Sequence, residues 1–141
     1  MLQVTKIFRF ETAHAIHGYS GLCKNIHGHS YVLHVTIAAQ DSNDEYLSSP
    51  GFIFDFKDLK HLVNKTIIHN LDHCIILSED FLKQHTFANS LENLTIWKME
   101  PSAENILLYI RKVLQKELPQ NVVLRKLKIY ETNDSYAEWE N

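Results

Sequence analysis

One long alternation of apolar and polar side chains constrains this chain most, and it runs from His29 to Ala39. Tyr31 and every second residue as far as Ile37 are apolar. Residues i and i+2 of a strand point to the same face, so the pattern predicts a long strand with one buried face. Alternation or β-branched content predicts further strands over residues 2–15, 122–131 and 137–139.

Helical spacing of apolar residues appears in two other segments. The first runs from Phe56 to Asn70 and follows Asp55, which we expect to cap it. The second opens at Pro101-Ser102, with Ser102 as its cap, and ends before Pro119. Residues 52–56 alternate as a short strand does, and residues 73–100 show no regular pattern beyond a turn of helix.

Together these elements predict a single α+β domain over residues 1–141, with two helices on one face of a sheet whose first two strands are antiparallel. A sheet of so few strands leaves two exposed edges. Such edges invite pairing with another chain, so we expect an oligomer.

Composition narrows the class of partner. The formal charge is −3 and the pI is near 6.3, which excludes the basic field typical of nucleic-acid or membrane-surface binding. The sequence shows neither a signal peptide nor an apolar run long enough to cross a bilayer, so we expect a cytoplasmic protein with a small-molecule partner. With only two cysteines, a free and functional thiol is the better expectation than a disulfide.

Three histidines suggest a metal site. His27 and His29 flank Gly28 and therefore point to one face of a strand, and His14 can join them from the neighbouring strand. Catalytic zinc commonly has three protein ligands and an open fourth position. The alternative is that these are buried histidines with ordinary hydrogen-bond partners, and spacing alone does not decide between the two.

Other residues suggest chemistry near that site. Cys23 lies four positions before His27, and a thiol near a metal ion is a candidate base or nucleophile, although a small buried hydrophobe is the alternative. Asp72-His73 fits a proton shuttle or merely a polar helix end. Glu131 ends a predicted strand, where a carboxylate near the core requires hydrogen-bond donors, such as the two adjacent N–H groups of a cyclic guanidine-like ligand. Glu104 lies in the first turn of the second predicted helix, where a carboxylate stabilises the helix N-terminus.

At this point the chain resembles the 6-pyruvoyl-tetrahydropterin synthase and 6-carboxytetrahydropterin synthase family, which has the tunnelling fold. The matching motifs run along nearly the whole sequence in order: Phe10-Glu-Thr-Ala-His14, Cys23-x-x-x-His27-Gly-His29-x-Tyr31, Asp55-Phe56-x-x-Leu59-Lys60, Leu71-Asp72-His73, Pro101-Ser-Ala-Glu104-Asn105 and Tyr130-Glu131-Thr132.

The resemblance implies a role for each motif residue. His14, His27 and His29 would bind Zn²⁺, and Cys23 would be the general base, assisted by Asp72 and His73. Glu131 would be catalytic and anchor the pterin ring, while Ser102, Glu104 and Thr132 would bind substrate. The fold implied is an antiparallel four-stranded sheet with two helices on one face. Sheets would join between subunits into a barrel, as a homohexamer made of two trimers.

The substrate implied is 7,8-dihydroneopterin triphosphate. Loss of triphosphate and acetaldehyde would give 6-carboxy-5,6,7,8-tetrahydropterin for queuosine and deazapurine synthesis, which we favour. Retention of the side chain would instead give 6-pyruvoyltetrahydropterin, for tetrahydrobiopterin. A non-catalytic pterin- or purine-binding relative is a further alternative, because Ala103 replaces a hydroxyl residue and the residues after His73 depart from the family pattern.

Overall fold

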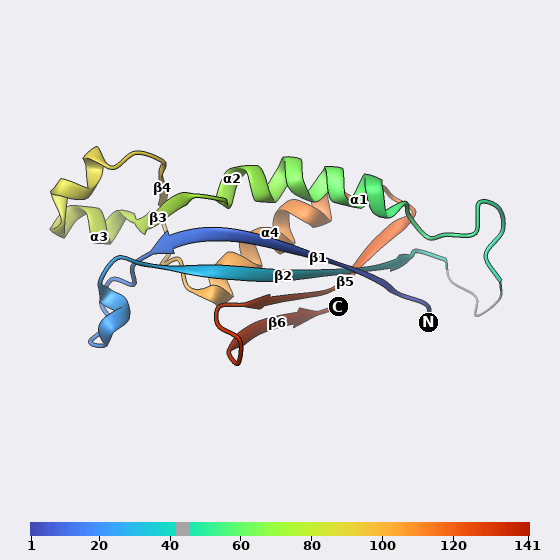
Figure 1. Ribbon diagram of the computed structural model, residues 1–141, viewed down its shortest axis with the longest axis horizontal. Coiled ribbons are helices and arrows are strands. Elements are labelled where there is room, and N and C mark those ends of the chain that lie inside the picture. The colour runs from blue at the N-terminus through green and yellow to red at the C-terminus, as the bar shows by residue number, and fades with distance from the viewer. Residues whose placement is uncertain (42–45) are drawn as a thin grey trace.

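The fold is built on one mixed sheet, seen in a computed structural model that describes residues 1–41 and 46–141. Within these ranges six strands form the sheet, in the order β4-β3-β1-β2-β5-β6. Figure 1 shows helices α1, α2 and α4 along one side of this sheet, with the β5–β6 hairpin at the end of the chain. The expected α+β class is therefore confirmed.

Four of the strands follow the predicted antiparallel order. They are β1 (Val4–His14), β2 (His27–Ala39), β5 (Val122–Tyr130) and β6 (Tyr136–Glu140). Each of the pairs β1–β2, β2–β5 and β5–β6 is antiparallel. The long strand beginning with the histidine pair is confirmed, and it starts two residues earlier than predicted.

The predicted four-stranded, wholly antiparallel sheet is wrong. Two short strands, β3 (Cys74–Ser78) and β4 (Leu94–Trp97), extend the sheet beyond β1 in the parallel sense. They lie in the segment predicted to be irregular. Short apolar runs carry no period that separates a buried strand from a buried helix, and a parallel strand need not alternate. Pairing of β3 with β1 and of β4 with β3, rather than local sequence, makes these two runs strands.

The helices begin where their capping residues predict. Asp55 accepts a hydrogen bond from the Lys57 amide and caps α1 (Phe56–Val63). A π-helical segment, η2 (Asn64–Ile68), and α2 (His69–Leu71) continue the same helix. Ser102 caps α4 (Ala103–Glu117), which ends two residues before Pro119.

Shorter helices lie at the other end of the molecule. They are η1 (Leu22–Lys24), α3 (Glu79–Gln84) and η3 (Thr86–Ser90). Residues 52–55 pair with none of the described strands, so the short strand suggested for residues 52–56 is wrong. Asp55 instead ends the extended segment by starting α1.

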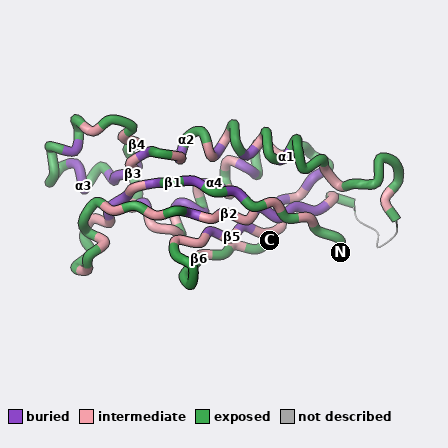
Figure 2. The backbone as a smooth tube through the Cα atoms, in the orientation of Figure 1, coloured by how far each residue is buried: buried purple, intermediate pink, exposed green. Residues whose placement is uncertain are grey.

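The core lies between the sheet and the long helices. Along β1, the side chains of Phe8, Phe10 and His14 are buried, whereas the alternate residues face away from the helices. Figure 2 shows this buried stripe running along the strands beneath α1 and α4. None of the helices in the described parts of the chain is long and apolar enough to span a bilayer.

Candidate active site

Strand register brings the three histidines together. In the antiparallel β1–β2 pair, His14 lies directly opposite His27, and Thr12 lies opposite His29. Since residues two apart share a face, all three imidazoles project from the helix-covered face of the sheet. The ring centroid of His14 is 4.5 Å from that of His27 and 5.2 Å from that of His29.

The nitrogen atoms of these rings are arranged as metal ligands are. One ligand atom from each of the three residues lies within 4.8 Å of the others. Nδ1 of His14 lies 2.6 Å from the Pro101 carbonyl oxygen, and Nδ1 of His27 lies 2.7 Å from that of Asn25. Donation by Nδ1–H to a carbonyl fixes the tautomer that leaves Nε2 free to bind a metal.

The remaining nitrogen atoms also fit a zinc ion. Nε2 of His14, His27 and His29 is buried and makes no hydrogen bond within the described residues. Burial, reinforced by the neighbouring imidazole of His27, lowers the pKa of His14 despite its bond to Pro101, which favours the neutral ring that binds metals. Three imidazoles with an open fourth position are the donor set of catalytic zinc.

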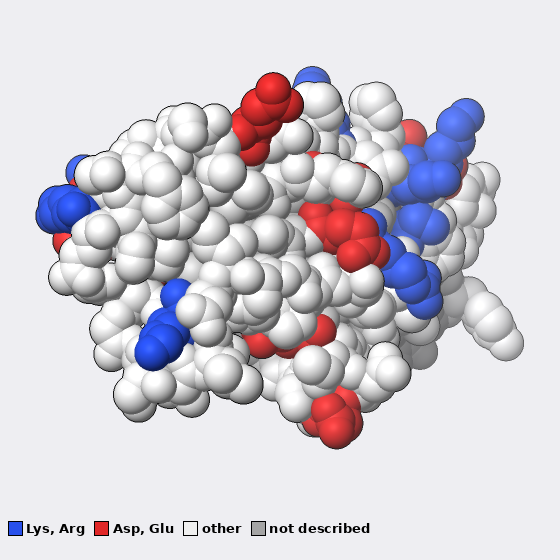
Figure 3. Space-filling view, turned by 60° about the vertical axis from the view of Figure 1, so that its left-hand side comes forward, with Lys and Arg blue, Asp and Glu red and all other residues white. Residues whose placement is uncertain are grey.

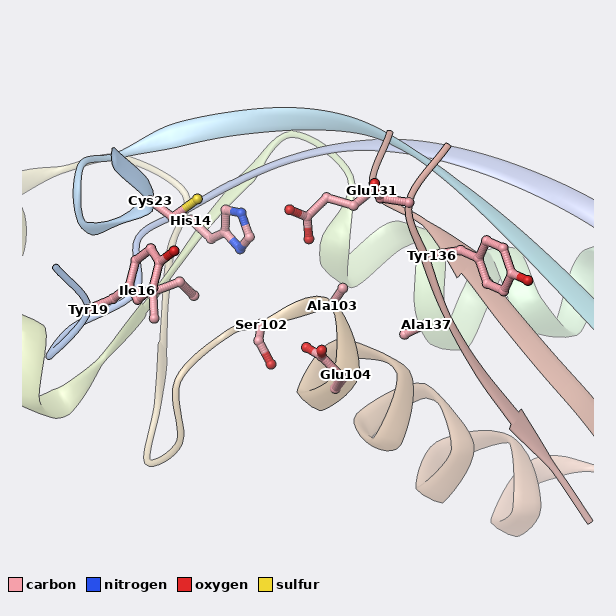
Figure 4. A pocket seen from close by; sticks show the side chains of 11 residues that line it. His14, Ile16, Tyr19, Cys23, Ser102, Ala103, Glu104, Glu131, Tyr136 and Ala137 are labelled. Carbon is pink, nitrogen blue, oxygen red and sulfur yellow. The ribbon is translucent and has the colours of Figure 1, made fainter. Parts of the chain in front are cut away.

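Cys23 lies on the short helix η1, in the loop between β1 and β2. The amide of Ile16 donates to the Cys23 carbonyl at 2.8 Å and folds this loop back over the end of β1. Figure 4 shows the Cys23 thiol beside the imidazole of His14. Neither described cysteine is in a disulfide, and Cys74 is the buried one.

A cavity of about 440 Å³ opens next to these residues. This volume is within the range of roughly 300–1,000 Å³ typical of small-molecule sites. His14, Cys23, Ser102, Glu104 and Glu131 all line the cavity. Figure 4 shows Glu131 reaching across it towards His14, with the first turn of α4 forming the opposite wall.

Glu131 follows the last residue of β5, where the strand register places it beside Tyr31 of β2. Its Oε1 lies 3.1 Å from Nε2 of His29, within ion-pair distance but without the geometry of a hydrogen bond. Burial raises the pKa of the Tyr31 phenol, and the nearby Glu131, Cys23 and Glu104 raise it further, so this phenol stays protonated. The cavity lining therefore includes a carboxylate, a thiol and the imidazole of His14, and the imidazoles of His27 and His29 lie beside that of His14.

Side-chain hydrogen bonds fix the start of α4 and connect it to the loop that follows β1. Ser102 Oγ accepts from the Asn105 amide at 3.3 Å, and the Asn105 side chain donates to the Glu100 carbonyl at 2.8 Å. The carboxylate of Glu100 in turn accepts from the His17 amide at 2.7 Å. These contacts orient the Ser102 and Glu104 side chains relative to the loop that carries Cys23.

Asp72 and His73 are not brought to this cavity within one chain. Oδ1 of Asp72 accepts from the Glu11 amide at 2.8 Å, and its Oδ2 lies 2.9 Å from Nδ1 of His73. The bond from Glu11 lowers the pKa of Asp72, and the contact with His73 adds to this effect. His73 lines a separate depression together with Ala13, Gly28 and Ser30 and with Thr12 and His29, whereas His14 and Cys23 line the first cavity.

Thr132 also lies outside the cavity lining. Its hydroxyl donates to Asp134 Oδ1 at 2.8 Å, within the turn that joins β5 to β6. Sequence reasoning missed several residues that do line the cavity: Ile16, Tyr19, Ser135, Tyr136 and Ala137. The last three arrive because the β5–β6 hairpin folds back beside β5, and Tyr136 opposite Tyr130 is a cross-strand aromatic pair that was available as a signal.

Known proteins resemble the chain along nearly its whole length. The family model described as "6-pyruvoyl tetrahydropterin synthase" matches residues 3–141. The "6-carboxy-5,6,7,8-tetrahydropterin synthase" of Rickettsia typhi is 33% identical, covering 98% of this chain and 99% of that protein. The protein of the same name from Haemophilus influenzae is 30% identical and covers 99% of each.

Solved structures agree on the fold. The 6-pyruvoyl tetrahydropterin synthase of Caenorhabditis elegans superimposes with a TM-score of 0.72 at 21% identity, covering 99% of this chain and 95% of that one. The family expected from the motifs is confirmed, and with it the expectation of an enzyme. The chain belongs to the 6-pyruvoyl tetrahydropterin synthase family.

Proposed function

We propose that this protein converts 7,8-dihydroneopterin triphosphate and water into 6-carboxy-5,6,7,8-tetrahydropterin, acetaldehyde and triphosphate. The observation that carries the proposal is a cavity lined by His14, Cys23 and Glu131, with the imidazoles of His27 and His29 gathered beside that of His14. The queuosine pathway and the cytoplasmic location expected from the sequence belong to the same proposal.

The relatives favour the carboxy product over the pyruvoyl product. The curated proteins of Rickettsia typhi and Haemophilus influenzae, at 33% and 30% identity, are both named for the carboxy product. The Caenorhabditis elegans structure is named for the pyruvoyl product, but at 21% identity it supports the fold alone. The two reactions release different products, because formation of the pyruvoyl product releases triphosphate without acetaldehyde.

Glu131 and Cys23 would act at different parts of the substrate. The Glu131 carboxylate suits the two parallel N–H groups on the guanidine-like edge of a pterin, which a carboxylate accepts in bidentate fashion. A zinc ion held by His14, His27 and His29 would supply Lewis acidity toward the side-chain hydroxyl groups. The Cys23 thiolate would take a proton from the side-chain carbon beside the phosphate ester, and triphosphate would leave with the electrons of its C–O bond.

Asp72 and His73 need a second copy of the chain if they assist Cys23. Within one chain neither residue lines the cavity that contains Cys23, and His73 lines a separate depression. The edge strands of the described sheet are β4 and β6, which leave backbone groups for pairing with another subunit. We therefore keep the homohexamer, with sheets joined into a barrel, as the assembly that completes the site.

Turnover by the purified, zinc-loaded protein tests this function. We expect release of triphosphate from 7,8-dihydroneopterin triphosphate, and Cys23→Ala is expected to lower kcat by at least about 100-fold, as loss of a general base does. Cys74→Ala is the matched control, because it removes a buried thiol that lies outside the cavity lining. Removal of zinc with a chelator, followed by its return, is expected to abolish and then restore turnover.

Two results would refute the proposal. Binding of the substrate without multiple turnovers would make the protein a pterin-binding relative. Full activity in the Cys23→Ala protein would show that the thiol has no part in the mechanism. The arrangement of the cavity would then no longer support the proposed function.

A further inference from the structure

A second cavity adjoins the candidate active site, and we propose that it binds the triphosphate group of the substrate. It has a volume of about 500 Å³ and is lined by His17, Lys24 and His85, among other residues. This inference rests on the proposed function, since it names the part of the active site that holds the phosphate chain.

The order of residues along the first cavity gives the substrate a direction. Glu131, Tyr136 and Ala137 lie at one end, whereas Cys23, Ile16 and Tyr19 lie at the other (Figure 4). With the pterin ring on Glu131 and the reacting carbon at Cys23, the side chain continues towards Ile16 and Tyr19. The triphosphate, at the far end of that side chain, must lie beyond these two residues.

The second cavity begins at that point. Ile16 and Tyr19 line both cavities, so the two spaces meet at the loop between β1 and β2. Its other walls come from the end of η1 and from α3, through Phe81 and Gln84. Cys23 and Lys24 are adjacent on the same helical turn, and one lines the first cavity while the other lines the second.

The groups around the second cavity are suited to a polyanion. Lys24 supplies a full positive charge, and His17 and His85 supply imidazoles that donate hydrogen bonds to phosphate oxygens when protonated. His85 is positioned by Phe81, with their ring centroids 4.4 Å apart. In contrast, the Glu131 end of the first cavity carries carboxylates, which repel phosphate.

Nearby carboxylates are already engaged. Asp80 is 2.8 Å from the ammonium group of Lys83, and this contact lowers its pKa. Glu100 accepts from the His17 amide and fixes the loop. Figure 3 shows basic and acidic residues interspersed on the face it displays, so the proposed site is a local one rather than part of a broad basic surface.

Binding measurements on the Cys23→Ala protein, which is expected to bind the substrate and to turn it over too slowly to consume it during a titration, test the subsite. The probes are 7,8-dihydroneopterin triphosphate and unphosphorylated 7,8-dihydroneopterin, titrated calorimetrically. Adding Lys24→Gln is expected to weaken binding of the triphosphate about tenfold, the cost of one charge-assisted hydrogen bond, without changing that of dihydroneopterin. His85→Gln is expected to act in the same direction, and Lys24→Arg to restore most of the affinity.

Lys116→Gln is the matched control. It removes the same charge from the exposed last turn of α4, about 20 Å along the helix from the first turn that lines the first cavity, and is expected to leave both affinities unchanged. Two results would overturn the subsite: an equal loss of affinity for both probes, or no loss of affinity in the Lys24→Gln and His85→Gln variants. In either case, turnover by the wild-type protein would still support the proposed function. Failure of the Cys23→Ala protein to bind either probe, together with no turnover by the wild type, would overturn both.

Discussion

At the scale of single residues, the site depends on where two strands start and stop. His14 is the last residue of β1 and His27 the first of β2, and their direct pairing places His29 one step further along the same face. Carbonyl oxygens of Pro101 and Asn25 then set the tautomers of two of the rings. Two paired β-strands and two short hydrogen bonds are thus enough to bring three Nε2 atoms together.

Removal of one ligand tests the metal site. We expect His27→Ala to weaken zinc binding more than about 100-fold, since loss of an outer-shell partner alone costs about 10–100-fold. Zinc content after dialysis and competition with a chelating dye measure this. His34→Ala is the control, because His34 lies on the same strand but on the opposite face. Equal zinc retention in the two variants would remove His27 from the ligand set.

Tyr31 gives a second prediction for a single residue. Its hydroxyl is buried and makes no hydrogen bond with the described residues, although the ring is packed 5.3 Å from that of Phe10. An unsatisfied buried hydroxyl is costly, so Tyr31→Phe is expected to keep or raise the melting temperature in the absence of substrate. A loss of more than about 1 kcal/mol in chemical denaturation would mean that the hydroxyl has a stabilising partner.

At the scale of helices and strands, the sequence predicts those elements whose ends or buried faces are determined by residues close by in the chain. The caps Asp55 and Ser102 start α1 and α4 because a side-chain oxygen satisfies a free amide wherever the helix begins. Alternation predicts β2 because one face is buried throughout. Strands β3 and β4 were missed because they are strands through pairing: β3 pairs with β1, about sixty residues earlier in the chain, and β4 pairs with β3.

The residues of the candidate site also fall into those that the sequence predicts and those that it does not. Motif residues with characteristic chemistry were predictable, whereas Ile16, Tyr19 and Ala137 carry no chemical signal and line the cavity only because loops and a hairpin fold over it. The placement of Asp72 and His73 on the opposite face follows from the turn after α2, where His73 adopts a positive φ of 58°. Sequence alone does not fix the direction of such a turn.

The connection between α2 and β3 predicts a pH effect. The hydrogen bond from the Glu11 amide lowers the pKa of Asp72 from its ordinary value of 3.8. The ionised carboxylate therefore stabilises the fold at any pH above 3.8. This contribution is lost as the pH falls through the lowered pKa. With 37% of the side chain exposed, we expect Asp72→Asn to cost less than about 1 kcal/mol near neutral pH. The difference from wild type in urea denaturation is expected to shrink as the pH falls from 3.8 through the lowered pKa; a constant difference would exclude the charge as its cause.

At the scale of the whole molecule, the sheet has two unlike faces. One carries the helices, the core and the histidine cluster, and the other exposes Glu11, Ser30 and His73. Because Cys23 and His73 line separate cavities within one chain, the proposed cooperation between them would need a second chain. This links the open sheet edges to activity, because assembly would complete each site as well as cover the edges.

Mixed oligomers test the shared site. Cys23→Ala and His73→Ala chains, each nearly inactive alone, are expected to regain about a quarter of wild-type activity when co-assembled at equal ratio, because a random quarter of the sites receive both intact residues. Tagged chains purified in tandem provide the mixed species. Absence of recovery in an oligomer shown to contain both chains would mean that each chain acts alone or that His73 has no part in the reaction.

The ratio of acetaldehyde to triphosphate released during turnover tests the proposed reaction most directly. Both products are measured in the same reaction with the zinc-loaded protein, and the pterin product is identified by mass spectrometry. We predict one acetaldehyde for each triphosphate, with 6-carboxy-5,6,7,8-tetrahydropterin as the pterin. Release of triphosphate without acetaldehyde, with a pterin that retains its three-carbon side chain, would contradict the account.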